Sequence, residues 1–234
     1  MAKIKFGIGV ADMRGSTGAA TFSRNTYGAY TRQKVTPVNP NSSKQSLVRG
    51  IFGGVSAAWR GLTDAQRDQF NEYAPQYSRT NVFGDNVPLT GQGLYQKANL
   101  NITKAGGTTI TSITAPVSLL PVTFSGADVD VSEDTMNIAD LSATGATDAI
   151  VVSATAPYSA GRSFVARNQY RQIGVKAASE GAGAFDCLPG YLAAFGFSPA
   201  DMTAGQKIAF IAERVNLTTG QVVSSGNIIA VIEA

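Results

Sequence analysis

Few residues of this chain are of the types that carry out chemistry, and histidine is missing altogether. The absence of histidine from the 234 residues excludes Ser-His-Asp and Cys-His catalysis, His-ligated metals and an imidazole proton shuttle. Cys187, the only cysteine, has no histidine to activate it, so we interpret it as a small buried apolar residue. A single cysteine also excludes an intrachain disulfide and multi-cysteine zinc sites. The residue types therefore argue against an enzyme and predict no cofactor and no metal.

Two further patterns suggest ligands but lack the spacing that those ligands need. The segment 126–135 (GADVDVSEDT) has four carboxylates that could gather on calcium, yet it lacks the central glycine and terminal glutamate of an EF-hand. We interpret it instead as a strand edge guarded by charges. The glycines at 7, 9, 15 and 18 match neither the dinucleotide-binding nor the P-loop pattern. They are typical of a flexible segment.

The charges are unevenly distributed along the chain, although the net charge is only +3. Residues 1–60 hold nine basic side chains and one acid, whereas residues 105–234 hold six basic and eleven acidic ones. A basic segment joined to an acidic body indicates contact with an anionic surface. That surface is either nucleic acid or the acidic face of a neighbouring subunit.

Residues 1–40 are predicted to form an extended basic arm. Apolar residues alternate loosely with small and basic ones, a β-hairpin is expected around Asn25-Thr26, and Pro37 and Pro40 favour an extended connector. Such an arm suits strand addition to a neighbouring sheet, and its small residues favour this over binding of single-stranded nucleic acid. The side chains expected at its interface are Phe6, Arg14, Phe22, Arg24, Tyr27, Tyr30, Arg32 and Lys34.

Residues 41–107 are predicted to be helical. Apolar residues from 48 to 62 recur at the spacing of one helix face, which predicts a helix over 43–60. Thr63 and Gln66 form a capping box for a second helix over 63–74, and Thr90 begins a third. A DNA-reading helix-turn-helix is the alternative, but acidic residues on the second helix would repel phosphate. A structural helical hairpin is favoured, with Trp59 as a core anchor or an interface residue and with Gly50, Gly53 and Gly54 where another backbone packs closely.

Residues 108–234 are predicted to form an antiparallel β-sandwich of the immunoglobulin or fibronectin-III type, which makes the chain mainly β. Short runs rich in Val, Ile and Thr recur there, separated by turn residues. A hairpin is expected through Thr219-Gly220, and a short helix near Leu192–Phe195. The predicted strands are 108–113, 121–126, 135–141, 149–155, 169–177, 206–215 and 227–234.

Two stretches of this sequence resemble a group of proteins encoded by tailed phages and prophages, including crAss-like phages of Bacteroidetes. The first is G-A-Y-T-R-x(4)-P-V-N-P-N from residue 28, continuing to Phe52, and the second is W-R-x-L-T-x-x-Q-R-x-x-F-x-x-Y-A from residue 59 to residue 74. The later strings VVSATAPYSAGRS and YLAAFG are similar to the C-terminal part of such proteins. The resemblance implies a structural part of the virion (capsid-associated, neck or ring, or tail) and brings no catalytic residues.

The sequence therefore favours a non-enzymatic virion component that is repeated many times and assembles through its arm. Its expected partners are copies of itself and other virion proteins. The competing class is a nucleic-acid-binding protein that uses residues 1–60 as its electrostatic footprint. A carbohydrate-active enzyme is a weaker third class, disfavoured by the missing histidine. The start of the chain does not have the pattern of a secretory signal, and no membrane span is expected. We expect synthesis in the host cytoplasm and a final location in the virion.

Overall fold

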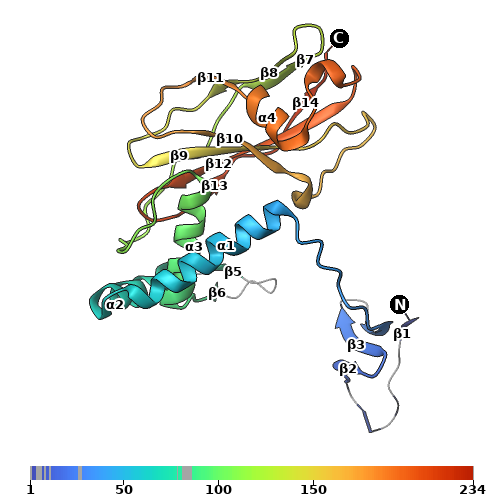
Figure 1. Ribbon diagram of the computed structural model, residues 1–234, viewed down its shortest axis with the longest axis vertical. Coiled ribbons are helices and arrows are strands. Elements are labelled where there is room, and N and C mark those ends of the chain that lie inside the picture. Colours follow the sequence, from blue (N-terminus) through green and yellow to red (C-terminus); the bar gives the residue numbers. More distant parts are fainter. Residues whose placement is uncertain are drawn as a thin grey trace. The chain divides into compact units, whose positions relative to one another are not determined.

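The chain combines helices with antiparallel sheets and divides into two compact units, residues 1–47 and residues 48–234 (Figure 1). The structure is a computed structural model that describes residues 2–3, 7, 9–10, 12–25, 28–77, 79–80 and 86–233. The helical region lies in the first half of the chain, as predicted. Each unit is described by itself below.

The first unit contains a four-stranded antiparallel sheet, here called the N-terminal sheet. Strands β3 and β4 pair from Ala20 with Gln33 to Asn25 with Gly28, so the predicted hairpin is present. The segment is thus a small sheet and not an arm extended over its whole length, because its strands find partners in one another. Residues 34–42, which contain both prolines, have no regular structure. The strand order is β1 (Ala2–Lys3), β4 (Gly28–Gln33), β3 (Ala20–Asn25) and β2 (Gly15–Thr17).

The helices begin and end close to the predicted residues. The Thr63 hydroxyl accepts a hydrogen bond from the Gln66 backbone N–H, and the Thr63 backbone N–H donates one to the side-chain oxygen of Gln66, so the capping box is confirmed. The hydroxyl of Thr90 accepts from the backbone N–H of Gly93 and caps the third helix. The helices are α1 (Ser43–Ala58), α2 (Asp64–Tyr73) and α3 (Gly91–Lys104), with 3-10 turns at Trp59–Gly61 and Ala74–Tyr77 and a two-stranded sheet of β5 (Arg79–Thr80) and β6 (Asn86–Val87).

An apolar core holds the helical region together. Phe70 and Tyr95 are buried at its centre with their rings in an edge-to-face contact, the centroids being 5.2 Å apart. Trp59 is half-buried and lies 6.0 Å from Phe70 and 5.4 Å from Tyr95, measured between ring centroids. Of the two roles expected for Trp59, the structure therefore supports the core anchor.

The remainder of the second unit contains a five-stranded and a three-stranded antiparallel sheet. In the larger sheet, β9 lies between β10 and β12, while β13 and β14 both pair with the opposite edge of β12. In the smaller sheet, β8 lies between β11 and β7. The strands are β7 (Gly126–Asp130), β8 (Thr135–Leu141), β9 (Asp148–Ala154), β10 (Arg171–Lys176), β11 (Gly183–Asp186), β12 (Lys207–Asn216), β13 (Val222–Ser224) and β14 (Ile228–Val231), and helix α4 spans Leu188–Phe195.

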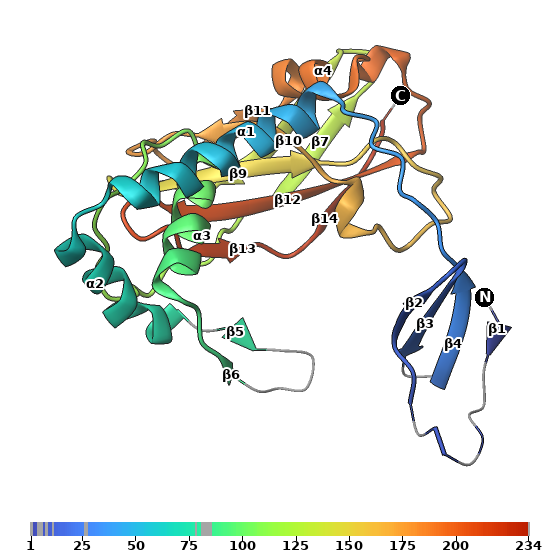
Figure 2. The same cartoon turned by 60° about the horizontal axis from the view of Figure 1, so that its bottom comes forward.

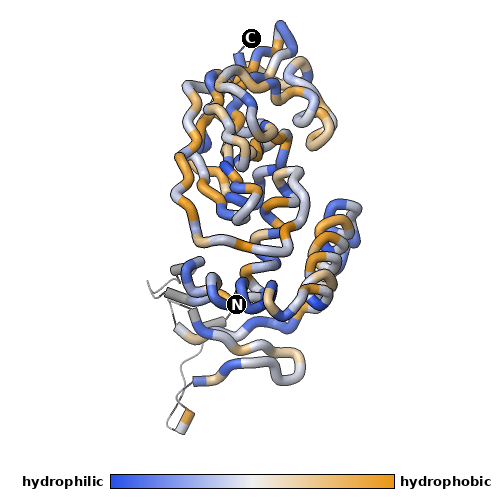
Figure 3. The backbone as a smooth tube through the Cα atoms, turned by 90° about the vertical axis from the view of Figure 1, so that its left-hand side faces the viewer, coloured by the Kyte–Doolittle hydropathy of each residue, from blue (hydrophilic) through white to orange (hydrophobic). Residues whose placement is uncertain are grey.

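One apolar core contains residues of both sheets. It includes Ile138 of β8, Val152 of β9 and Phe210 of β12, all fully buried, and Tyr191 of α4. Alternate residues of β9 and β12 face the other way, where Val151 packs near the end of α3 in a smaller cluster (Figure 2). In Figure 3, hydrophobic segments, drawn in orange, are frequent along the part of the tube that ends at the C-terminus. Because β9 and β12 are covered on both faces, their burial is nearly continuous along each strand.

Two predicted strands are wrong, and side-chain hydrogen bonds explain the first. Residues 108–113 form no strand, because the amide of the buried Asn99 bonds both the N–H and the C=O of Ile110. Ile113 is buried in the helical core, so the apolar pattern reports burial and not strand pairing. Residues 121–125 likewise form no strand. Strand β7 begins only at Gly126, the last residue of the predicted run. Five of the predicted runs do contain strands, namely β8, β9, β10, β12 and β14, and α4 and the turn at Thr219-Gly220 are also confirmed.

Candidate assembly surface

The N-terminal sheet carries one aromatic and one arginine on each of its two faces. Phe22 is paired with Thr31 across the sheet, and Arg24 is two residues further along the same face. Tyr30 and Arg32 have the opposite parity and lie on the other face. The two arginines are exposed and the two aromatic residues are half-buried. Both faces therefore offer an aromatic surface beside a positive charge.

No described side chain of the first unit is buried. A sheet of three or more strands ordinarily needs an apolar face packed on a core to be stable in water. In the N-terminal sheet neither face has such a core among the described residues, and the edge strand β2 is exposed throughout. The sheet consequently lacks the main source of stability of an isolated domain.

Two other predicted arm residues, Arg14 and Lys34, lie next to the ends of strands β2 and β4. Arg14 pairs with the carboxylate of Asp12 at 3.0 Å, and this pair is exposed, so it contributes little. The backbone N–H of Lys34 donates to the carbonyl of Ala19, which extends the pairing beyond β4. Phe6 and Tyr27, the two remaining interface predictions, lie outside the described residues. The structure thus brings the described members into one sheet, divided between its faces and its ends.

Helix α1 adds a second uncovered apolar surface. Val55 is buried and Ile51 half-buried against the helical core, but the same helix face continues toward the N-terminus through Leu47, Val48 and Phe52, which are 64%, 61% and 47% exposed. We call these three residues the α1 stripe. A continuous apolar face of this kind is normally covered by another apolar surface.

Among the described residues, no other backbone packs closely against the glycines of α1. A β-carbon built on Gly50, Gly53 or Gly54 would meet nothing within 4 Å, which contradicts the prediction of close packing there. The space beside each of them is open. Within the subunit these glycines cost helix stability and gain no compensating contact.

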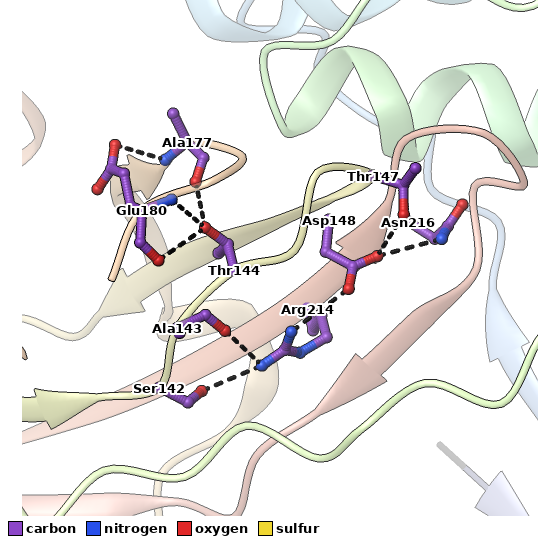
Figure 4. Close-up of polar contacts among 9 residues, drawn as sticks. All are labelled: Ser142, Ala143, Thr144, Thr147, Asp148, Ala177, Glu180, Arg214 and Asn216. Carbon is purple, nitrogen blue, oxygen red and sulfur yellow. Dashed lines mark hydrogen bonds and ion pairs between the residues drawn. The ribbon is translucent and has the colours of Figure 1, made fainter. Parts of the chain in front are cut away.

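A buried polar network fixes the loops at one end of the five-stranded sheet (Figure 4). The guanidinium of Arg214 is 5% exposed and donates to the Asp148 carboxylate at 3.4 Å, to the Ser142 hydroxyl at 3.2 Å and to the Ala143 carbonyl at 3.0 Å. Asp148 also accepts from the side-chain amide of Asn216 at 3.1 Å. The network was not predicted, because the residues that meet in it are separated by up to 72 positions in the sequence.

The acidic segment 126–135 forms a strand, a turn and the start of the next strand. The Asp130 carboxylate accepts from the backbone N–H and hydroxyl of Ser132 and from the backbone N–H of Glu133. These hydrogen bonds, that of Glu133 foremost, lower the pKa of Asp130. Its oxygens therefore stabilise a tight turn. No group of three Cys, Asp or Glu side chains with the geometry of a metal site occurs in the described part of the chain.

Cys187 is fully buried beside the core, as the sequence predicted. Burial is the main cause that raises the pKa of its thiol to about 12, and the neighbouring carboxylate of Asp186 adds to it. A thiol with this pKa is protonated at neutral pH and is a poor nucleophile.

Comparison with known proteins gives no match to a protein family, to a curated protein or to a solved structure. In the part of the chain that the structure describes, no helix combines the length and the apolar character needed to cross a membrane. The functional argument therefore depends on the geometry of this chain and on the sequence resemblance.

Proposed function

We propose that this protein is a non-enzymatic structural subunit of a tailed-phage virion, repeated in many copies and held to its neighbours through residues 1–40 and the α1 stripe. The observation that carries the proposal is the N-terminal sheet, which has regular strand pairing but no buried side chain among its described residues. A neighbouring subunit would supply the missing apolar cover. The sequence resemblance supports placement in the virion, as part of the capsid, the neck or ring, or the tail.

We further propose that the five-stranded and three-stranded sheets of the second unit form a β-sandwich of the immunoglobulin or fibronectin-III type. In support, both sheets are antiparallel and contribute side chains to one core. The sandwich would be the rigid body of the subunit. The N-terminal sheet and the α1 stripe would then be the parts that vary in their contacts from copy to copy.

Deleting residues 1–40 tests the proposed mode of assembly. All four apolar cores of the chain lie within residues 55–232, so the shortened chain should fold and melt within a few degrees of the full chain. It should remain a monomer at concentrations at which the full chain forms oligomers in analytical ultracentrifugation. Normal assembly of the shortened chain would contradict the proposal, and so would its unfolding.

A nucleic-acid-binding function is the second candidate, because Arg24, Arg32 and Lys34 are exposed and form no ion pair with a described carboxylate. Salt titration of DNA binding separates the two functions. Tight binding whose affinity falls steeply with salt, and which is lost on deleting residues 1–40, would favour this candidate. Oligomers that persist after nuclease treatment would favour the structural subunit.

A further inference from the structure

A cleft in the second unit lies between the loop that follows β9 and the residues around α4. Its volume is about 450 Å³, within the range of sites for small organic ligands. Two arginines and three aromatic residues form much of its lining, and no lining residue is acidic. We call it the arginine cleft and define it by Arg162, Arg171, Tyr158, Phe195 and Phe197.

Neutral groups hold both arginines in place. Arg171 donates to the carbonyl of Ala194 at 2.8 Å, and its guanidinium lies over the ring of Phe195, 4.9 Å from the centroid. Arg162 donates to the carbonyl of Phe164 and to the side-chain oxygen of Gln169, each at 2.7 Å. Neither arginine forms an ion pair with a carboxylate of the described residues, so no such carboxylate compensates either positive charge.

Each guanidinium also keeps donors for a ligand. Of its five N–H groups, Arg171 uses one and Arg162 uses two in the hydrogen bonds described above. The carbonyls and the aromatic rings orient each guanidinium plane, which lowers the entropy lost when it binds an oxyanion.

The aromatic part of the cleft is anchored in the protein core. Phe195 stacks on the fully buried ring of Tyr191 with 4.5 Å between the centroids, and Phe197 packs against Tyr191 edge to face at 5.9 Å. Tyr191 is fixed in turn by a hydrogen bond from its hydroxyl to the carbonyl of Thr155. The cleft therefore offers a preformed apolar surface beside two charges.

Tyr158 lies beside Arg162 in the lining of the cleft. Its hydroxyl is buried and has no hydrogen-bond partner among the described residues, and Arg162 lies over its ring at 5.8 Å from the centroid. Burial is the main cause that raises the pKa of this hydroxyl, so it stays protonated at neutral pH.

We propose that the arginine cleft binds a phosphate monoester carried on a ring, such as a nucleoside monophosphate or a sugar phosphate. The charge of the ligand decides its chemical class. A phosphate monoester has a second pKa near 6 and therefore carries nearly two negative charges at pH 7. This charge matches the two guanidinium groups, which have no carboxylate partner among the described residues. A carboxylate carries only one. The planar forks of the arginines suit phosphate oxygens, while the ring rests on the aromatic surface. This binding site is additional to the proposed structural role and does not depend on it.

Titration calorimetry of the full chain tests the proposal with thymidine 5′-monophosphate and ribose 5-phosphate. We expect both to bind, inorganic phosphate to bind more weakly, and thymidine and glucuronate to give no comparable heat. If thymidine 5′-monophosphate binds much more tightly than ribose 5-phosphate, the natural ligand is a nucleoside monophosphate and not a sugar phosphate. A 5′-phosphorylated oligonucleotide that binds better than its unphosphorylated form would identify the end of a strand as the source.

Substitutions locate the binding in the cleft. Arg162→Gln and Arg171→Gln should each weaken binding by about tenfold or more, because each removes charge-assisted hydrogen bonds. Arg162→Lys, which keeps the charge without the fork, should recover only part of the affinity. Arg60→Gln, an exposed arginine on the turn after α1, is the matched control and should have no effect.

Three results would overturn the proposal. One is the absence of binding at millimolar phosphate ester, and another is equal binding of glucuronate. The third is an equal loss of affinity in Arg60→Gln, which would assign the effect to general surface charge. Should Arg171→Gln lower the melting temperature through its contact with α4, Arg162→Gln decides, since Arg162 contacts only its own loop.

Discussion

Arg214 is a charged side chain inside a packed sheet, and its neighbours explain how it is tolerated. Its donors reach a carboxylate, a hydroxyl and a carbonyl, and the carboxylate of Asp148 is fixed on its other side by Asn216. Charged groups are normally buried only when they are paired and hydrogen-bonded in this way. The network ties the loop after β8 to β12, so the ion pair positions a loop.

Arg214→Met is expected to lower the free energy of unfolding by about 3 kcal/mol, because it leaves the partly buried carboxylate of Asp148 without its cation. Urea unfolding followed by circular dichroism measures the change. Arg14→Met is the matched control, since its ion pair with Asp12 is exposed, and it should cost less than about 1 kcal/mol. Similar small changes in both variants would show that the Arg214 network does not stabilise the fold.

Cys187 gives a prediction about alkaline pH. The pKa of its thiol is about 12 in the folded chain and ordinarily near 8.5 in an unfolded one. The folded state therefore keeps a proton that the unfolded state loses. Stability associated with this thiol is fully present below about pH 8.5 and is lost progressively as the pH rises toward 12.

Replacing Cys187 with Ala removes this contribution, so the variant should lose less stability than the parent chain between about pH 9 and pH 11. Denaturant unfolding across that range measures the difference. In the native state the thiol should also react with a disulfide reagent only at the rate of unfolding. Rapid labelling at pH 7.5 would contradict the burial of this residue.

At the scale of elements, the sequence predicts well where a local signal exists. The spacing of apolar residues and the capping box at Thr63 mark α1 and α2 within a few residues, and the alternation in 135–141 marks β8. The apolar pattern predicts a strand wrongly where a distant side chain forms the backbone hydrogen bonds that a neighbouring strand would form. The amide of Asn99 does so at Ile110. Burial of Ile113 produces the same apolar pattern as a strand would, so the sequence alone cannot separate the two.

In the candidate site, too, the sequence could have predicted some features and could not have predicted others. Strand alternation could have placed Phe22 and Tyr30 on opposite faces once the hairpin register was known, but the register depends on turn residues that the pattern does not fix. The arginine cleft could not be predicted, because its lining comes from the loop after β9 and from the region of α4, which only tertiary packing brings together.

Gly190 gives a prediction about the packing of α4 on β10. A β-carbon at this position would lie 1.3 Å from the carbonyl oxygen of Ile173, so the helix can approach the strand only because Gly190 has no side chain. Gly190→Ala should therefore destabilise the chain by about 3 kcal/mol or more, measured by thermal or urea unfolding. Gly181→Ala, where a β-carbon meets nothing within 4 Å, is the control and should change stability by less than about 1 kcal/mol. Equal effects would show that α4 is not held against β10 as described.

At the scale of the whole molecule, stability and contact surfaces lie in different parts of the chain. The four apolar cores lie within residues 55–232, while the N-terminal sheet and the α1 stripe leave aromatic, aliphatic and basic side chains uncovered. The acids are concentrated in residues 105–234, so in the proposed assembly one copy would offer negative charge to the basic segment of another. Such a division suits a subunit that folds by itself and orders its N-terminal part on assembly.

Hydrogen exchange at low and high protein concentration tests this central claim most directly. The account predicts that in dilute, monomeric protein the amides of β3 and β4 exchange rapidly while those of β9 and β12 are strongly protected, because only the latter belong to a buried core. As oligomers form, the protection of β3 and β4 should rise, and that of β9 and β12 should stay unchanged. Strong protection of β3 and β4 in the monomer would contradict the account, as would rapid exchange of these strands in the assembled protein.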